Sequence, residues 1–367
     1  VYNSTTQPYD CLVESLDGDP LNSWSATIRL FTNAGLSAIP DGSLCAFFVK
    51  ETINGTEQSF GSNTTNRSHI KMVGFITQDT NTLSWAQNTI TFSVLSPLAR
   101  LGLIAGFSKV FISTNDPVNW IGIKSLTSIR ALVQILRKYT TWTDLFDLVI
   151  PADARLYPAL YIQKLTPLEQ VRELADGLDC RFTCDRQGRG EIALHPAYVP
   201  LASRSGVTTT LTLDSNDIID ASFTREHQRK IETMEVRGFT YGTSPQPIFC
   251  RWTGVPGEGA QSVIVERIIA DSQDDLNERA GRRGALADGV FINADGVLRR
   301  AVTLRLTLYG SFDVFDFYKE WIAISLSGST NLRGIALSDY RFWLNSVNVT
   351  YEGGTARVAL ELMSETN

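Results

Sequence analysis

The chain has 367 residues, 43% of them hydrophobic and 20% charged, and its formal net charge is −6 at pH 7. This length and composition indicate a folded protein of two or three domains. The negative charge argues against a general nucleic-acid binder, because neutralising phosphates requires clustered Lys and Arg. No apolar run is long enough to cross a membrane as a helix.

Residues 1–117 have the pattern of a small β-barrel domain. Asn81 and Asn88 stand at turns between runs rich in β-branched and aromatic residues, which occupy 24–32, 43–51, 70–78, 81–87 and 88–97. The segment 54–69 is polar and rich in Gly and Asn, which is typical of an exposed loop. We therefore expect a first β-barrel in this domain.

Residues 118–205 have a mixed pattern that predicts an α/β adapter domain. Apolar residues recur at helical spacing over 125–138, and basic residues stand in the last turn. A second helix is predicted after Thr166, which is placed as the N-cap, with Pro167 at the first helical position and Glu169 three residues after the cap. After Gly177 the period shortens to two, and a turn at 185–190 predicts a hairpin.

Residues 206–367 return to a β pattern and predict a second barrel. Strands are expected at 208–215, 218–226 and 231–240, and again at 299–310, 321–327, 339–353 and 355–364. Between these groups, about 243–300 reads as an insertion that contains a helix at 272–289. The predicted fold class is a β-rich α+β fold: two small tube-type β-barrel domains, an α/β adapter segment and a helical insertion.

The sequence presents no catalytic constellation. Neither Gly-rich stretch, 185–190 or 254–260, carries the Lys and Ser/Thr of a phosphate loop. Nucleophile-elbow and zinc-peptidase motifs are also missing from the sequence. We expect no catalytic residues, no cofactor and no metal, and no clearing of peptidoglycan by the pure protein.

Two clusters of side chains could hold a cation, but each has a simpler interpretation. One lacks the familiar zinc spacings and is better explained by packed thiols and a surface imidazole: Cys180, Cys184 and His195. The other begins a predicted helix, where carboxylates interact favourably with the helix dipole: Asp271, Asp274, Asp275 and Glu278. The other histidines, His69 and His227, lie in separate segments.

The cysteines form an odd and scattered set: Cys11, Cys45, Cys180, Cys184 and Cys250. On one strand, Cys180 and Cys184 would lie about 13 Å apart, which is too far for a disulfide. We predict reduced, buried thiols in a protein made in cytoplasm.

Two other features suggest a carbohydrate-binding or adhesive extracellular protein. One is the set of tryptophans that could stack on sugars: Trp24, Trp85, Trp120, Trp142, Trp252, Trp321 and Trp343. The other is a set of glycosylation sequons at Asn3, Asn54, Asn63, Asn66 and Asn348. Core packing explains most of the tryptophans, and chance explains the sequons in a chain rich in Asn, Ser and Thr.

Several stretches together resemble a known family. They are MVGFITQDTNTLSWAQNTITFSVLSPLARLG (72–102), SLTSIRALVQILRKYT (125–140), LTPLEQVRELADGLDCRFTCDRQGRGEIAL (165–194), IIDASFTREHQRKIETMEVRGFT (218–240), LNERAGRRGAL (276–286) and SLSGSTNLRGIALSDYRFWLNSVNVTYEGGTARVALELM (325–363). In pattern and order they resemble the baseplate-hub, or tail-tip hub, proteins of phage tails and related contractile injection systems. This family includes the late-control proteins and the base of type VI secretion spikes.

The resemblance implies a homotrimer in which two barrels per chain make a ring of six similar units. It implies contacts with a tail tube or distal-tail protein, a spike or central fibre, and a tape-measure protein, in a virion assembled in the host cytoplasm. DNA would pass through the channel without specific binding. Barrel-edge strands such as Ala301–Tyr309 are the expected subunit contacts. The alternatives are a distal-tail ring or another tail-tip protein, and the carbohydrate-binding reading above.

Overall fold

The computed structural model describes residues 10–31, 42–48, 52–53, 56–57, 70–84, 88–103, 107–112, 148–149, 159–185, 188, 190–198, 208–225, 231–240, 246–254, 261–270, 272–288, 290–292, 298–309, 314–315, 317–327, 331–332, 334–337, 340–352 and 355–366. The fold is β-rich with few helices, as predicted. The helix expected at 125–138 lies outside the described residues.

The first β unit is built from five main strands. They are β1 (Asp10–Gly18), β2 (Trp24–Phe31), β3 (Leu44–Phe48), β6 (Ile70–Ser84) and β7 (Thr89–Leu95), in the spatial order β1-β2-β7-β6-β3. Alternate residues of β2 point inward, so that Trp24, Ala26 and Ile28 are buried in one core with Phe92 and Val94 of β7. Two short strands, β4 (Thr52–Ile53) and β5 (Thr56–Glu57), pair with each other, and helix α1 (Pro97–Leu103) follows β7.

The second β unit has its own core and the same strand order. Its strands are β14 (Ile218–Arg225), β19 (Leu298–Tyr309), β20 (Trp321–Ser327), β21 (Tyr340–Glu352) and β22 (Thr355–Thr366), in the spatial order β14-β19-β22-β21-β20. When the five strands of each unit are numbered along the chain, their order across the sheet is first, second, fifth, fourth, third in both units. An additional strand, β13 (Thr208–Asp214), pairs in parallel with β20. The common topology supports a duplicated unit.

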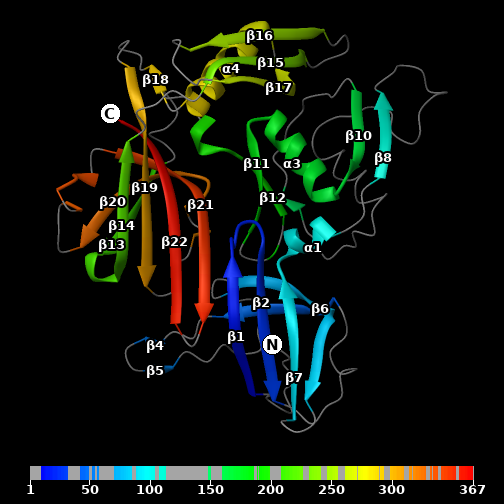
Figure 1. The fold of residues 1–367 in the computed structure, drawn as a ribbon, viewed down its shortest axis with the longest axis vertical. Coiled ribbons are helices and arrows are strands. Elements are labelled where there is room, and N and C mark those ends of the chain that lie inside the picture. Colours follow the sequence, from blue (N-terminus) through cyan, green and yellow to red (C-terminus); the bar gives the residue numbers. More distant parts are fainter. Residues whose placement is uncertain are drawn as a thin grey trace.

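The two units share one continuous sheet. Ser15–Gly18 of β1 pair antiparallel with Val349–Glu352 of β21. Figure 1 shows the strands crossing the molecule in order, from β14 and β19 at the left to β7 and β6 at the right. The prediction that Ala301–Tyr309 form an exposed edge is wrong, because this part of β19 pairs with β14 on one side and β22 on the other.

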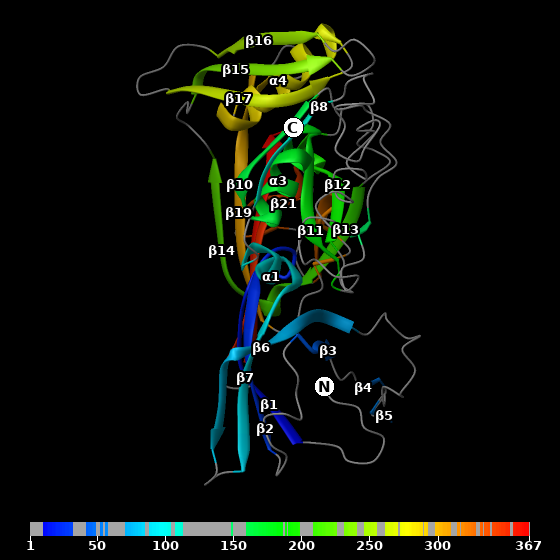
Figure 2. The same ribbon diagram turned by 90° about the vertical axis from the view of Figure 1, so that its right-hand side faces the viewer.

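The insertion is a small layer of its own. Strands β16 (Pro247–Thr253), β15 (Ile231–Thr240) and β17 (Gln261–Ala270) form a three-stranded sheet, and α4 (Gln273–Asp288) packs on one face of it. A short strand, β18 (Val290–Ile292), then pairs with the start of β19. Figure 2 shows this layer above the long sheet. Because β15 belongs to this sheet, the insertion begins near residue 231, earlier than the 243 expected from sequence.

The adapter lies between the insertion and the first β unit (Figure 1). It contains α3 (Pro167–Gly177) and the hairpin of β11 (Cys180–Cys184) and β12 (Gly190–Leu194), both predicted from sequence. The predicted capping box is present: Thr166 accepts from the Glu169 backbone N–H, and Glu169 Oε2 accepts from the Thr166 N–H. The other adapter strands are β9 (Leu148–Val149), which pairs with β12, and β10 (Ala159–Leu165). β10 pairs with β8 (Phe107–Ile112), which precedes the predicted adapter in the chain.

Candidate functional site at the adapter junction

The main concentration of buried charge lies where the adapter meets α4. Asp179 lies in the turn between α3 and β11, directly after the C-cap residue Leu178, with a backbone φ of 58°. This left-handed conformation is uncommon for residues other than Gly, although Asp and Asn tolerate it best. The backbone carbonyl of Asp179 accepts from the His195 N–H at 2.9 Å. The tight turn thus aims a carboxylate toward the insertion, and the Asp179 side chain is only 7% exposed.

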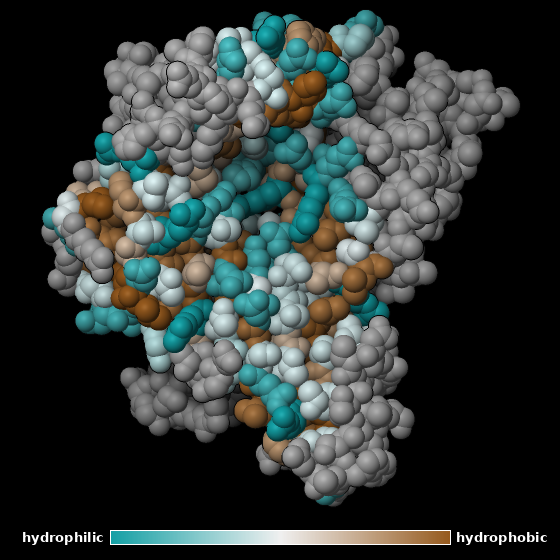
Figure 3. All heavy atoms as spheres, in the orientation of Figure 1, coloured by the Kyte–Doolittle hydropathy of each residue, from teal (hydrophilic) through white to brown (hydrophobic). Residues whose placement is uncertain are grey.

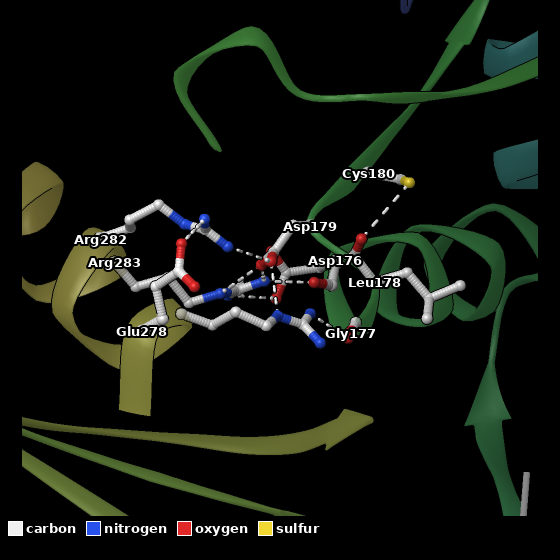
Figure 4. A network of polar contacts seen from close by, with 9 residues as sticks. Asp176, Gly177, Leu178, Asp179, Cys180, Glu278, Arg282 and Arg283 are labelled. Atoms are coloured by element: carbon white, nitrogen blue, oxygen red, sulfur yellow. Dashed lines mark hydrogen bonds and ion pairs between the residues drawn. The ribbon is translucent and has the colours of Figure 1, made fainter. Parts of the chain in front are cut away.

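Helix α4 supplies the opposite charges. Arg279 and Arg283 are four residues apart and therefore share one helix face. Arg279 Nε lies 2.5 Å from Asp179 Oδ2, and Arg283 Nε donates to Asp179 Oδ1 at 2.9 Å. Figure 4 shows Arg283 reaching toward Asp179 from α4.

The same two arginines also complete the end of α3. Arg279 Nη2 donates to the Gly177 carbonyl at 2.8 Å, and Arg283 Nη2 donates to the Asp176 carbonyl. Helix α3 ends with carbonyls that lack partners within the helix, and cations at this end interact favourably with its dipole. Two arginines from the insertion therefore act as a C-terminal cap for the adapter helix.

Asp179 is the critical member of this network, because it is the buried carboxylate that pairs with both buried arginines. The side chains of Arg279 and Arg283 are only 3% and 6% exposed, whereas that of Asp176, which also pairs with Arg283, is 58% exposed. Removing one partner of a buried ion pair leaves a buried charge without compensation, which costs several kcal/mol. The network therefore makes the adapter and the insertion one unit.

A second network joins the hairpin to the second β unit. Arg181 Nη1 donates to the Leu344 carbonyl of β21 at 3.0 Å, and its guanidinium lies 5.4 Å from the ring centre of Tyr318. Burial lowers the pKa of Arg181 to about 10, so the residue remains charged at neutral pH. Tyr318 and Lys319 both donate to Glu191 of β12, so each hairpin strand contacts this unit.

A third set of contacts joins the adapter to the first β unit. The Cys184 N–H donates to the Leu21 carbonyl at 2.7 Å, and Arg172 Nη2 donates to Asn22 Oδ1 at 2.7 Å. Leu21 and Asn22 lie in the turn between β1 and β2. One helix and one hairpin therefore contact the insertion and both β units.

The candidate metal residues are spread along the hairpin. Cys180 pairs with Leu194 at one end of β11 and Cys184 with Gly190 at the other. Within the described residues, no group of three His, Cys, Asp or Glu side chains is arranged to hold a metal ion. The histidines His69 and His227 lie outside the described residues.

His195 is partly buried rather than fully exposed. Its Nδ1 accepts from the Ala197 N–H at 3.1 Å, so the imidazole is held neutral. Burial, reinforced by the nearby charges of Arg181 and Arg283, lowers the pKa of His195 to about 3. Asp179 acts in the opposite direction but is outweighed.

The cysteines that the structure describes fit the prediction of thiols. Cys45, Cys180, Cys184 and Cys250 form no disulfide with one another, and burial raises the pKa of the Cys184 thiol. The side chain of Cys11 lies outside the described part of the chain.

The other candidate residues have structural positions. Trp24, Trp321 and Trp343 are buried in cores, and Trp252 packs beside Gly284 of α4. Three of the sugar-stacking candidates are thus enclosed, while Trp85, Trp120 and Trp142 lie outside the described residues. Asp274 and Asp275 occupy the first turn of α4, and Glu278 pairs with Arg282 at 2.7 Å; Asp271 is not described.

Comparison with solved structures identifies the fold. A tail protein from Neisseria meningitidis is similar with a TM-score of 0.53 and 13% identity, over 95% of this chain and 90% of that one. The prophage MuSo2 tail protein from Shewanella oneidensis gives 0.50 and 12%, over 97% and 94% of the two chains. The chain has the fold of phage tail proteins.

A component of the Escherichia coli type VI secretion system shares this tail-protein fold. Its TM-score is 0.51 with 10% identity, over 97% of this chain and 74% of that one, and it is described as similar to bacteriophage T4 tail proteins. The resemblance found in the sequence is thus confirmed at the level of fold. No family model matches the chain, and no curated protein matches it.

Proposed function

We propose that the chain is a structural hub of a phage tail tip or baseplate, or of a related contractile injection system. Three copies form a ring of six similar β units, which joins a six-fold tail tube or distal-tail protein to a three-fold spike or central fibre. The tape-measure protein is a further candidate partner. The ring lines a channel through which DNA passes without specific binding.

The duplicated β unit carries this proposal. Both units have the strand order first, second, fifth, fourth, third, and the β1–β21 ladder joins them within each chain. Three such chains present six similar positions to a six-fold neighbour and three identical chains to a three-fold one. The fold shared with tail and type VI secretion proteins supports the same assignment.

The role is structural rather than catalytic. The buried charges at the adapter junction are paired with one another and hold α3, the hairpin and α4 together. None of the helices in the described residues is long and apolar enough to cross a membrane. The expected location is the tail tip of a virion assembled in the host cytoplasm.

The mass of the protein in solution tests this proposal. Sedimentation equilibrium over a range of concentrations should reveal a trimer of the 40.6 kDa chain. A hexamer would favour a distal-tail ring instead.

A further inference from the structure

The two β units can be aligned residue by residue through a shared irregularity. In β1 the register with β2 skips one residue between Val13 and Ser15, and Ser15 then faces Thr27. In β14 the register with β19 skips one residue between Ile218 and Asp220, and Asp220 then faces Thr307. Bulges fix strand register, so Ser15 corresponds to Asp220 and Thr27 to Thr307.

Burial along the second strands supports this alignment. It matches the buried residues Trp24, Ala26 and Ile28 with Leu304, Leu306 and Leu308, which are also buried. A shift by one residue would place buried positions opposite exposed ones, because side chains alternate between the two faces of a strand.

The alignment can then be extended to the fifth and fourth strands of each unit and checked at the hairpin turn between them. Thr27 faces Ser93 and Thr307 faces Ala359, which aligns β7 with β22. The next ladder pairs Thr82 with Thr91 and Thr350 with Arg357, so that Thr82 corresponds to Thr350. The last pair before each hairpin turn then coincides, Ser84 with Thr89 in one unit and Glu352 with Thr355 in the other.

The joint within the chain uses the fourth strand of one unit and the first strand of the other. Ser15 faces Glu352, Leu16 faces Tyr351, and Asp17 faces Thr350. Leu16 and Tyr351 join the core on one side of the sheet, and on the other side Thr350 Oγ1 donates to Asp17 Oδ1 at 3.2 Å.

In the corresponding strands, one edge is left open within the described part of the chain. β14 pairs with β19 alone, and residues 82–84 of β6 pair with β7 alone. β14 is first in the strand order, and β6 is followed only by β3, which pairs with Ile70–Phe75. The two open edges lie at opposite sides of Figure 1, so one chain cannot join them to each other. An open strand edge is a site for pairing with another chain.

We propose that β14 of one copy pairs antiparallel with β6 of the next, repeating the β1–β21 joint. The alignment fixes the register: Asp220 faces Ser84 of the next copy, Ala221 faces its Leu83, and Ser222 faces its Thr82. This contact rests on the proposed trimeric ring, to which it adds the strands and the register. Ser222 and Thr82 replace Asp17 and Thr350 as a polar cross-strand pair, a combination that stabilises sheets.

The surface at β14 suits a covered edge. Ile219, the residue at the bulge, is 48% exposed and Tyr309 at the end of the neighbouring β19 is 57% exposed. Figure 3 shows hydrophobic patches over the second β unit at the left of the view. Burial of this apolar surface would add to the backbone hydrogen bonds of the joint.

The number of strands in the proposed ring sets the width of its channel. Each copy contributes eight strands from β14 to β6, so three copies would close a sheet of twenty-four. Closed sheets of about 16 to 18 strands already enclose a water-filled channel. A closed sheet of this size is therefore wide enough for an open lumen.

Engineered cysteines test the register. The double variant Thr82→Cys/Ser222→Cys places one thiol on each side of the proposed contact, and each single variant controls for the native thiols. Asp17→Cys/Thr350→Cys is the matched control, because it places the same pair at the equivalent joint within one chain. Thr82→Cys/Ala221→Cys controls for the face of the sheet, since neighbouring residues point to opposite faces.

Mild oxidation of the trimeric protein, followed by a non-reducing gel, gives the readout. The Thr82/Ser222 variant should yield cross-linked dimers and trimers and nothing larger, whereas Asp17/Thr350 should cross-link without an increase in mass. A trimer without this ladder, or an equal ladder from Thr82/Ala221, would overturn the proposed contact while leaving the hub assignment standing. A chain that stays monomeric at every concentration would overturn the trimeric ring and the contact with it.

Discussion

At the scale of single residues, Asp179 is the side chain on which the adapter junction depends most. We predict that Asp179→Asn, which retains a residue tolerant of the left-handed backbone, lowers the free energy of unfolding by about 3–5 kcal/mol, because two buried arginines lose their shared carboxylate. Urea denaturation measures the loss.

The matched control is Asp176→Asn. This carboxylate is 58% exposed and also pairs with Arg283, so we expect a loss of at most about 1 kcal/mol. Equal losses from the two variants would contradict the importance given to burial.

The lowered pKa of His195 predicts that the stability of the folded chain depends on pH. Its pKa is about 3 in the folded chain against an ordinary value of 6.5, so below pH 6.5 the unfolded chain binds a proton that the folded chain does not. Stability is therefore lost as pH falls from about 6.5 towards 3, by up to about 1.4 kcal/mol per pH unit.

His195→Asn keeps an acceptor for the Ala197 N–H and removes this titration. The difference in unfolding free energy between wild type and variant should shrink or reverse as the pH is lowered from 7 to 4. A difference that is constant over this range would show that the imidazole titrates normally in the folded chain.

At the scale of elements, we predict that replacing Gly by Ala changes stability in opposite directions at two positions of α4. A Cβ at Gly284 would lie 2.2 Å from Trp252 Cδ2, whereas a Cβ at Gly281 would meet no atom within 4 Å. Gly284→Ala should therefore destabilise the protein by about 1–3 kcal/mol through overpacking. Gly281→Ala should stabilise it by about 0.5–1 kcal/mol, because Ala favours the helix.

Thermal unfolding of the two variants provides the measurement, and each serves as the control for the other. Destabilisation by Gly281→Ala comparable to that by Gly284→Ala would mean that α4 does not pack on β16 as the structure shows.

Elements with a local signal could be predicted from the sequence. The capping box of α3 requires only Thr166 and Glu169, and the hairpin after it follows from an alternating pattern around a Gly-rich turn. The pairing of Asp179 with Arg279 and Arg283 could not be predicted, because about 100 residues separate the partners and each charge alone reads as a solvated surface residue. The placement of β15 was missed for a related reason: its alternation fits either sheet, and only tertiary pairing decides between them.

At the scale of the whole molecule, the likeness between the two β units was expected but the joint between them was not. The ladder from β1 to β21 connects the beginning and end of the chain, and nothing local marks either strand as its partner. Ala301–Tyr309 lies inside the sheet rather than at the expected edge, because β19 pairs with both β14 and β22. Within the described residues, β14 and residues 82–84 of β6 each keep one open edge, and these are the edges that the proposed ring joins.

The central claim is that three copies of this chain form the hub ring. Cryo-electron microscopy of the assembled tail tip counts the copies directly, without depending on how the isolated protein associates. The account predicts three copies around one axis, each contributing two β units to a six-part ring. Six or twelve copies would contradict it.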